Sequence, residues 1–133
     1  MIIDIDEILR SFELNNPYLQ FYLHKSSGRV EVVTEIPGVE PKTNVMDHPD
    51  KYIKIPSQKE LNLPEMIKGF VPKMKDAAQR EAFQRSIEEG KTVPELEAEL
   101  SQMGLVQYWY TYEHLQFRKI AEKWCRDNKI DFE

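Results

Sequence analysis

The spacing of hydrophobic residues changes along the chain from mixed helix and strand patterns to a helical pattern. Apolar residues at helical spacing over 5–12 predict a short amphipathic helix. Segments 18–24 and 29–36 are rich in aromatic and β-branched residues, which favours strands, and Gly28 between them favours a hairpin. Residues 52–55 predict a third, shorter strand of the same sheet.

Helical spacing dominates the rest of the chain. Ser57 and Thr92 are each followed three residues later by Glu, the pattern of a capping box at a helix start. Gly90 and Gly104 are placed to end helices, because glycine readily adopts the left-handed conformation found there. A final long helix is predicted over about residues 105–128.

Together these elements predict an α+β fold, with a small antiparallel N-terminal sheet packed with a mostly helical C-terminal half. The length of 133 residues fits one domain over 1–133 and suffices to bury a core. Hydrophobic residues make up 41% and charged residues 31%, a balance typical of globular proteins.

Charge and cysteine content exclude several classes of protein. The chain has 18 Lys and Arg against 23 Asp and Glu, a formal net charge of −5, which disfavours binding to nucleic-acid phosphates or anionic membranes. Its single cysteine, Cys125, forms neither an internal disulfide nor a Cys-based zinc site, as expected in the reducing cytoplasm. The acidic N-terminal segment is unlike a signal peptide, and no window is apolar enough to span a membrane. We therefore expect a cytoplasmic protein.

The final helix carries more aromatic surface than one buried stripe requires. Its main predicted core stripe consists of Val106, Tyr110, Phe117, Ile120, Ala121 and Trp124. Tyr108, Tyr112 and Leu115 lie on a different face, with Trp109 between the two faces. Two interpretations stay open. Either this half of the helix is packed on several sides, or Tyr108 and Tyr112 bind a partner protein, since tyrosine is enriched at interfaces.

The same helix carries a family resemblance. Its motif residues are Trp109, Tyr110, Thr111, Tyr112, Phe117, Arg118, Ala121 and Trp124. The earlier segments that match are Ile3-Asp4-Ile5, Tyr22-Leu23 with Ser27-Gly28-Arg29-Val30, and Tyr52-Ile53-Lys54-Ile55-Pro56 with Met66 and Phe70. In these motifs and their order, the chain resembles the bacterial uncharacterised protein family numbered 0158 in the UPF series. That family has no established function, so the resemblance implies no substrate or mechanism.

A metal site is one candidate for chemistry. Residues 37–50 are rich in proline and poor in large apolar residues, which predicts a surface loop. Within this loop Asp47, His48 and Asp50 offer carboxylate and imidazole ligands. The alternative is that they are solvated turn residues, and we predict neither a metal site nor a cofactor.

The remaining candidates are single ionisable residues. Glu113 and His114 are neighbours on the last helix and project about 100° apart, so they do not face each other. His24 is expected within the first hairpin, and Cys125 is expected to be a buried packing residue. The sequence has no phosphate-binding glycine loop, GxSxG or HExxH motif. It therefore predicts no catalytic residue.

Three hypotheses for function follow. The first is a non-catalytic binding or interaction module whose partner is another protein. The second is an enzyme with a dispersed site, assisted by a metal near Asp47, His48 and Asp50. The third is a regulator that binds a small molecule between sheet and helices. The sequence leaves the ligand and the oligomeric state open.

Overall fold

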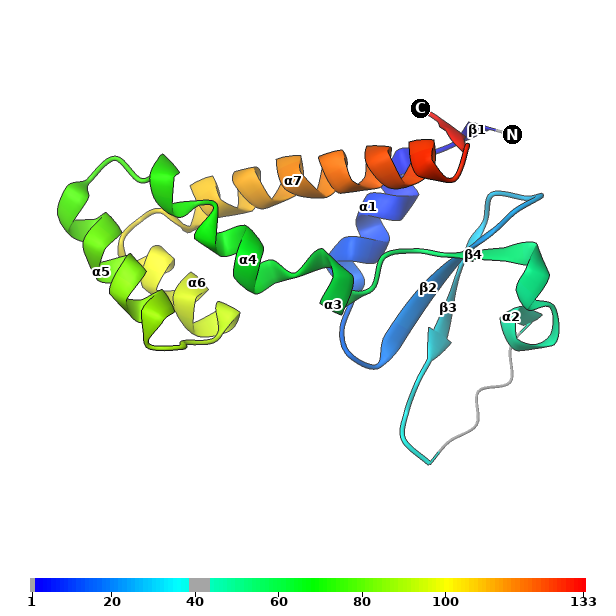
Figure 1. Cartoon of the computed structure of the whole chain (residues 1–133), viewed down its shortest axis with the longest axis horizontal. Helices are drawn as coiled ribbons and strands as arrows, with labels where there is room; N and C mark the ends of the chain where they lie inside the picture. Colours follow the sequence, from blue (N-terminus) through cyan, green and yellow to red (C-terminus); the bar gives the residue numbers. More distant parts are fainter. Residues whose placement is uncertain (1, 39–43) are drawn as a thin grey trace. The chain divides into compact units, whose positions relative to one another are not determined.

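A computed structural model describes residues 2–38 and 44–133 (Figure 1). Its α+β architecture confirms the predicted fold class, with an antiparallel N-terminal sheet and a mostly helical C-terminal half. The chain forms two compact units. Unit 1 comprises Met1–Leu61 and Phe117–Glu133, and unit 2 comprises Asn62–Gln116. The prediction of one domain over 1–133 stays a prediction.

The sheet of unit 1 contains three antiparallel strands (Figure 1). They are β2 (Leu19–His24), β3 (Val30–Thr34) and β4 (Tyr52–Lys54), in the order β3-β2-β4. All three strands were predicted, with ends that differ by one or two residues. Gly28 has a positive φ of 73° in the turn between β2 and β3, which explains the glycine there.

Both ends of the chain meet in a second, parallel pair of strands that the sequence analysis did not predict. β1 (Ile2–Ile3) pairs with β5 (Asp131–Phe132). In sequence, β1 is followed by α1 (Ile5–Leu14), which precedes the larger sheet and is capped by Asp4. The carboxylate of Asp4 accepts a hydrogen bond of 2.9 Å from the backbone N–H of Asp6.

The segment before β4 is not a simple loop. It contains α2 (Asn44–Asp47) and a 3₁₀ turn, η1 (Pro49–Lys51), so the prediction of a loop over 37–50 is wrong here. Val45 on α2 is buried, and the burial of its side chain favours packing of α2 within unit 1. Residues 39–43 lie outside the described part of the chain.

The core of unit 1 combines the first helix with the second half of the last helix, α7 (Val106–Asp127). The rings of Phe12 on α1 and Phe117 on α7 meet edge to face, with centroids 5.5 Å apart. Other buried apolar residues of this unit are Ile3, Ile5, Ile8, Leu9, Phe21, Leu23, Val33, Val45, Ile55, Leu61, Ala121, Cys125 and Ile130. In sequence β4 is followed by α3 (Gln58–Leu61), which starts with the predicted capping box.

Unit 2 is entirely helical. Its elements before α7 are α4 (Leu63–Lys68), η2 (Val71–Lys73), α5 (Ala77–Glu88) and α6 (Val93–Gln102). Thr92 begins α6 with the predicted capping box, in which both reciprocal hydrogen bonds form. Within residues 2–38 and 44–133, none of the helices has the length and apolar character needed to cross a membrane.

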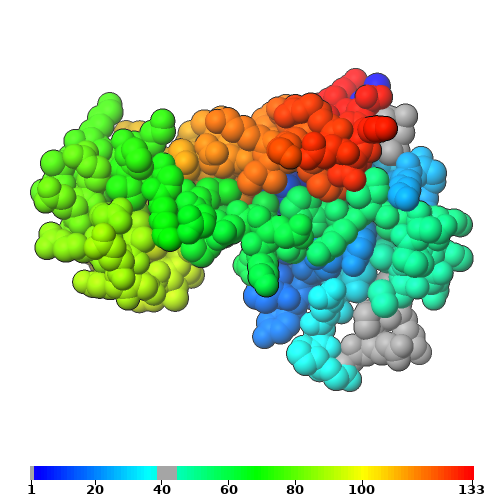
Figure 2. All heavy atoms as spheres, viewed as in Figure 1, coloured from blue at the N-terminus to red at the C-terminus, as the bar shows by residue number. Residues whose placement is uncertain are grey.

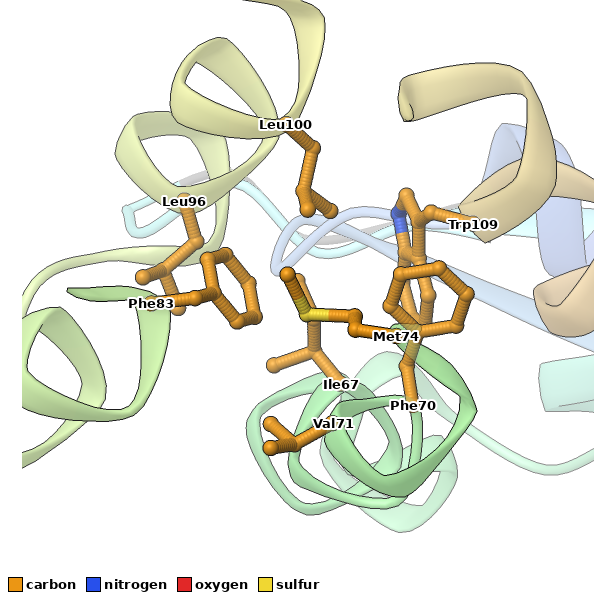
Figure 3. Close-up of a cluster of buried hydrophobic side chains, with 8 residues drawn as sticks. All are labelled: Ile67, Phe70, Val71, Met74, Phe83, Leu96, Leu100 and Trp109. Carbon is orange, nitrogen blue, oxygen red and sulfur yellow. The ribbon is translucent and has the colours of Figure 1, made fainter. Parts of the chain in front are cut away.

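A compact hydrophobic cluster holds unit 2 together (Figure 3). Its buried members are Ile67, Phe70, Val71, Met74, Phe83, Leu96, Leu100 and Trp109. They come from α4, η2, α5, α6, α7 and the short connections after α4 and η2. Trp109 is fully buried, and its ring centroid lies 5.8 Å from that of Phe70.

The predicted core stripe of α7 requires a correction. Tyr110, which was assigned to that stripe, is 43% exposed, whereas Trp109 is 0% exposed. The two halves of α7 bury different faces, because Trp109 in unit 2 and Phe117 in unit 1 differ by about 80° around a helix. A single straight stripe along the helix therefore misplaces Tyr110.

Candidate functional site

The two tyrosines singled out by the sequence have different environments. Tyr108 is 68% exposed, the most exposed large apolar side chain among the described residues. Tyr112 is half-buried and packs on the core cluster, with its ring centroid 5.6 Å from Phe70 and 6.0 Å from Trp109. Of the two interpretations left open above, packing therefore accounts for Tyr112, and Tyr108 is the one available to a partner.

Tyr108 belongs to an exposed face of α7 that also includes Thr111 and Leu115. Leu115 is 54% exposed, and seven residues bring it within about 20° of Tyr108 around the helix. Thr111 lies between them and is exposed, with its hydroxyl donating to the carbonyl of Gln107 at 3.1 Å. We call Tyr108, Thr111 and Leu115 the α7 apolar strip. Tyr108 and Leu115 were placed on this face from the sequence, whereas Thr111 was not.

The rotation of α7 about its axis is fixed by Trp109. Its indole N–H donates a hydrogen bond of 2.8 Å to a carboxylate oxygen of Glu97 on α6, while its ring packs against Phe70. Because Trp109 points into the core, Tyr108 and Leu115 lie about 100° and 120° away from it on the same side. Packing in unit 2 thus holds the α7 apolar strip toward solvent.

The strip itself is uncharged. On another side of the same helix, the negative charge of Glu97 on α6, with partial burial and Glu113, raises the pKa of the Tyr110 hydroxyl. Within α7, the first turns up to residue 116 contain only Glu113 and His114 as acidic or basic residues. Neither lies on the line that joins Tyr108 and Leu115, because Glu113 is about 140° from Tyr108 around the helix and His114 about 120°. Figure 2 shows α7, in orange, at the surface on the face viewed.

The structure does not bring the metal-like residues into one site. Asp47 ends α2, Asp50 lies in η1, and His48 lies between them, all three exposed. Across residues 2–38 and 44–133, no three His, Cys, Asp or Glu side chains are grouped so that they could hold a metal ion. The metal-assisted hypothesis therefore gains no geometric support there.

Each of the remaining candidates has its own local environment. His24 is half-buried in β2, where its Nδ1 accepts a hydrogen bond of 3.1 Å from the backbone N–H of Ser27. Its ring also meets Tyr52 edge to face, with centroids 5.0 Å apart. Cys125 is fully buried, and burial raises the pKa of its thiol from 9.0 to about 11. His114 is exposed on α7.

Concave surfaces of the molecule are lined by charged groups. One concavity of about 530 Å³ in unit 2 is lined mainly by α5 residues, among them Arg80, Arg85 and Glu88. Another of about 530 Å³ in unit 1 is lined by residues that include Lys25 and Lys129. Small-molecule sites are mostly apolar with a few placed polar groups, so these linings do not favour the regulator hypothesis.

A comparison with protein families tests whether the chain belongs to the family that its sequence resembles. The model of the Uncharacterised protein family (UPF0158) matches residues 1–133. The chain belongs to this family. The comparison with curated proteins gave no match, and neither did the comparison with solved structures. Membership of UPF0158 therefore explains the motifs on α7, while a function has to be argued from the surface of the molecule.

Proposed function

We propose that this UPF0158 chain is a non-catalytic interaction module that binds another protein through the α7 apolar strip. The observation that carries the proposal is the exposure of Tyr108 and Leu115 on one face of a helix whose rotation Trp109 fixes. Folding buries large apolar side chains where it can, and contiguous exposed ones are typical of binding surfaces.

The spacing of the three residues in the strip indicates the kind of surface that a partner would present. Tyr108, Thr111 and Leu115 follow the i, i+3, i+7 pattern by which a helix places anchors in an apolar groove. Because the strip is uncharged, we expect the partner to present an uncharged apolar groove. The hydroxyl of Tyr108 would remain at the rim, where it can hydrogen-bond to the partner or to water.

Site-specific photo-crosslinking in the protein's own cells tests the proposal. A benzophenone amino acid at position 108 should give a crosslinked product with one partner of discrete mass. The same residue at position 18 is the matched control, because Tyr18 is 56% exposed but lies in unit 1. Products at neither position, or equal products at both, would refute the α7 apolar strip as a binding surface.

Leu115→Asp supplies the second arm of this test. We expect at least about a tenfold loss of the crosslink from position 108, because a carboxylate would be desolvated in the apolar groove. The free energy of unfolding should change by less than about 0.5 kcal/mol, since Leu115 is at the surface. If the crosslink survives Leu115→Asp undiminished, the partner binds elsewhere.

Native mass spectrometry of gently purified protein separates this proposal from the other two hypotheses. An interaction module should appear bare or with a second protein chain. A stoichiometric metal or metabolite would instead favour the dispersed enzyme site or the small-molecule regulator.

A further inference from the structure

The two edges of the sheet in unit 1 differ in how they are protected. β4 is three residues long, and the carbonyl of Lys54 on its outer edge accepts a hydrogen bond of 3.2 Å from the indole of Trp124. Short length and a lysine are common means of protecting an edge strand from pairing with another chain. Pro56 lies two residues beyond the end of β4 and further limits pairing at this edge.

β3 lacks these protections. It lies at the end of the strand order β3-β2-β4, so within residues 2–38 and 44–133 no strand pairs with its outer edge. Residues 30–36 contain neither Lys nor Pro. Val32 is 46% exposed, and Ile36 is exposed as well. An exposed, β-branched, unprotected edge strand is a ready template for another strand.

The hydrogen-bond pattern shows which residues of β3 face outward. The N–H of Glu35 donates to the carbonyl of Tyr18, and the N–H of His24 donates to the carbonyl of Arg29. Odd-numbered residues of β3 therefore bond to β2, because hydrogen-bonded and non-bonded pairs alternate along an antiparallel ladder. The even-numbered residues Val30, Val32 and Thr34 direct their N–H and C=O groups to the open edge.

We propose that the open edge of β3 pairs antiparallel with β3 of a second copy of this chain, centred on Val32. In this register Val32 lies opposite Val32 of the second copy, and Val30 lies opposite its Thr34. The outward N–H and C=O groups of these residues can then form about six backbone hydrogen bonds. The two three-stranded sheets become one six-stranded sheet with a two-fold axis at Val32.

Charge complementarity selects this register and a second copy as the occupant. Centring on Val32 places Arg29 opposite Glu35 of the second copy, and the two-fold axis repeats this pair. Both residues are exposed, so their side chains are available for it. Opposite charges directly across two strands stabilise the pairing, and like charges destabilise it.

The neighbouring registers are disfavoured by the same rule. Sliding one strand by two residues in one direction places Glu31 opposite Glu31 of the second copy. Sliding it in the other direction places Glu31 opposite Glu35. Of these three registers, only the one centred on Val32 pairs β3 with β3 of the second copy along its full length and also places opposite charges at both ends. This inference concerns unit 1 and does not rest on the α7 apolar strip.

A charge swap in the full chain tests the inference by sedimentation velocity over a range of concentrations. Wild type should show a reversible monomer–dimer equilibrium. Arg29→Glu and Glu35→Arg should each raise the dimer dissociation constant at least about tenfold, because each creates two like-charge pairs. The double variant Arg29→Glu/Glu35→Arg restores both opposite-charge pairs and should return the constant to within about threefold of wild type.

Two further variants complete the design. Val32→Pro removes an N–H that points to the open edge rather than to β2, so it should abolish the dimer while unit 1 stays folded by circular dichroism. Lys119→Glu reverses an exposed charge on α7 and should leave the dissociation constant unchanged. A wild type that stays monomeric, a dimer insensitive to the single reversals, or a double variant without rescue would each overturn the inference.

Discussion

At the scale of single residues, the buried thiol of Cys125 should make folding stability sensitive to alkaline pH. Burial raises the pKa of this thiol from 9.0 to about 11, against a smaller opposing effect of Arg126. The folded chain therefore holds the thiol proton more tightly than the unfolded chain. This contribution to stability is fully present below pH 9.0 and is lost as pH rises toward about 11.

The measurement is urea unfolding of wild type and Cys125→Ala at several values of pH from neutral to alkaline. Because lysines and tyrosines also titrate in this range, the relevant quantity is the difference between the two chains, which isolates Cys125. We expect wild type to lose stability relative to Cys125→Ala as pH rises from 9.0 toward about 11. Rapid labelling of the folded wild type by Ellman's reagent at neutral pH would contradict a buried, protonated thiol.

The residues of α7 also show which side-chain environments can be predicted from the sequence pattern and which cannot. Tyr108 stayed open from sequence between packing and binding to a partner, and only the structure shows that its side chain is exposed. Tyr112 could not be placed, since its packing depends on Phe70, which comes from a distant part of the chain. Tyr110 was assigned to the buried stripe and Trp109 was placed between two faces, because periodicity assumes one buried face and α7 buries two different ones.

At the scale of elements, the contact between α4 and α7 depends on a glycine. A Cβ at Gly69 would lie 2.6 Å from the hydroxyl oxygen of Tyr112 and 3.2 Å from the carbonyl of Met66. Gly69→Ala should therefore destabilise the protein by about 1–3 kcal/mol, even though alanine is the better helix former. Urea unfolding monitored by tryptophan fluorescence measures this change.

Removing the opposing hydroxyl provides the control. Tyr112→Phe keeps the ring packed on Phe70 but deletes the atom that the new Cβ would meet. In the double variant Gly69→Ala/Tyr112→Phe, the cost should fall to less than half of its value in Gly69→Ala alone. If Gly69→Ala destabilises the protein equally with Tyr112 and with Phe at position 112, the clash with the carbonyl of Met66, rather than with Tyr112, causes the loss of stability.

Elements with local signals were predictable, and those defined by distant partners were not. The capping boxes at Ser57 and Thr92 lie within four residues of sequence, and their reciprocal hydrogen bonds form as predicted. β1 and β5 are two residues each and come from opposite ends of the chain. Neither has a pattern of its own, because each exists only through pairing with the other.

At the scale of the whole molecule, α7 is one continuous helix whose residues belong to both compact units. It supplies Trp109 to the core of unit 2 and Phe117 to the core of unit 1. Unit 1 is also built from two separate segments of the chain, which flank unit 2 in sequence. We therefore predict that the chain unfolds as one cooperative domain, in agreement with the expectation from its length.

Trp109→Ala tests this prediction, because it removes a fully buried side chain from unit 2 alone. It should cost about 3–5 kcal/mol. In a cooperative chain the variant should lower hydrogen-exchange protection of slowly exchanging amides by similar amounts in β2 and in α6. Tyr110→Ala, the neighbouring exposed aromatic, should cost less than about 1 kcal/mol and serves as the control. If protection falls in α6 while β2 keeps its own, the two units unfold separately, and the prediction of one domain is wrong.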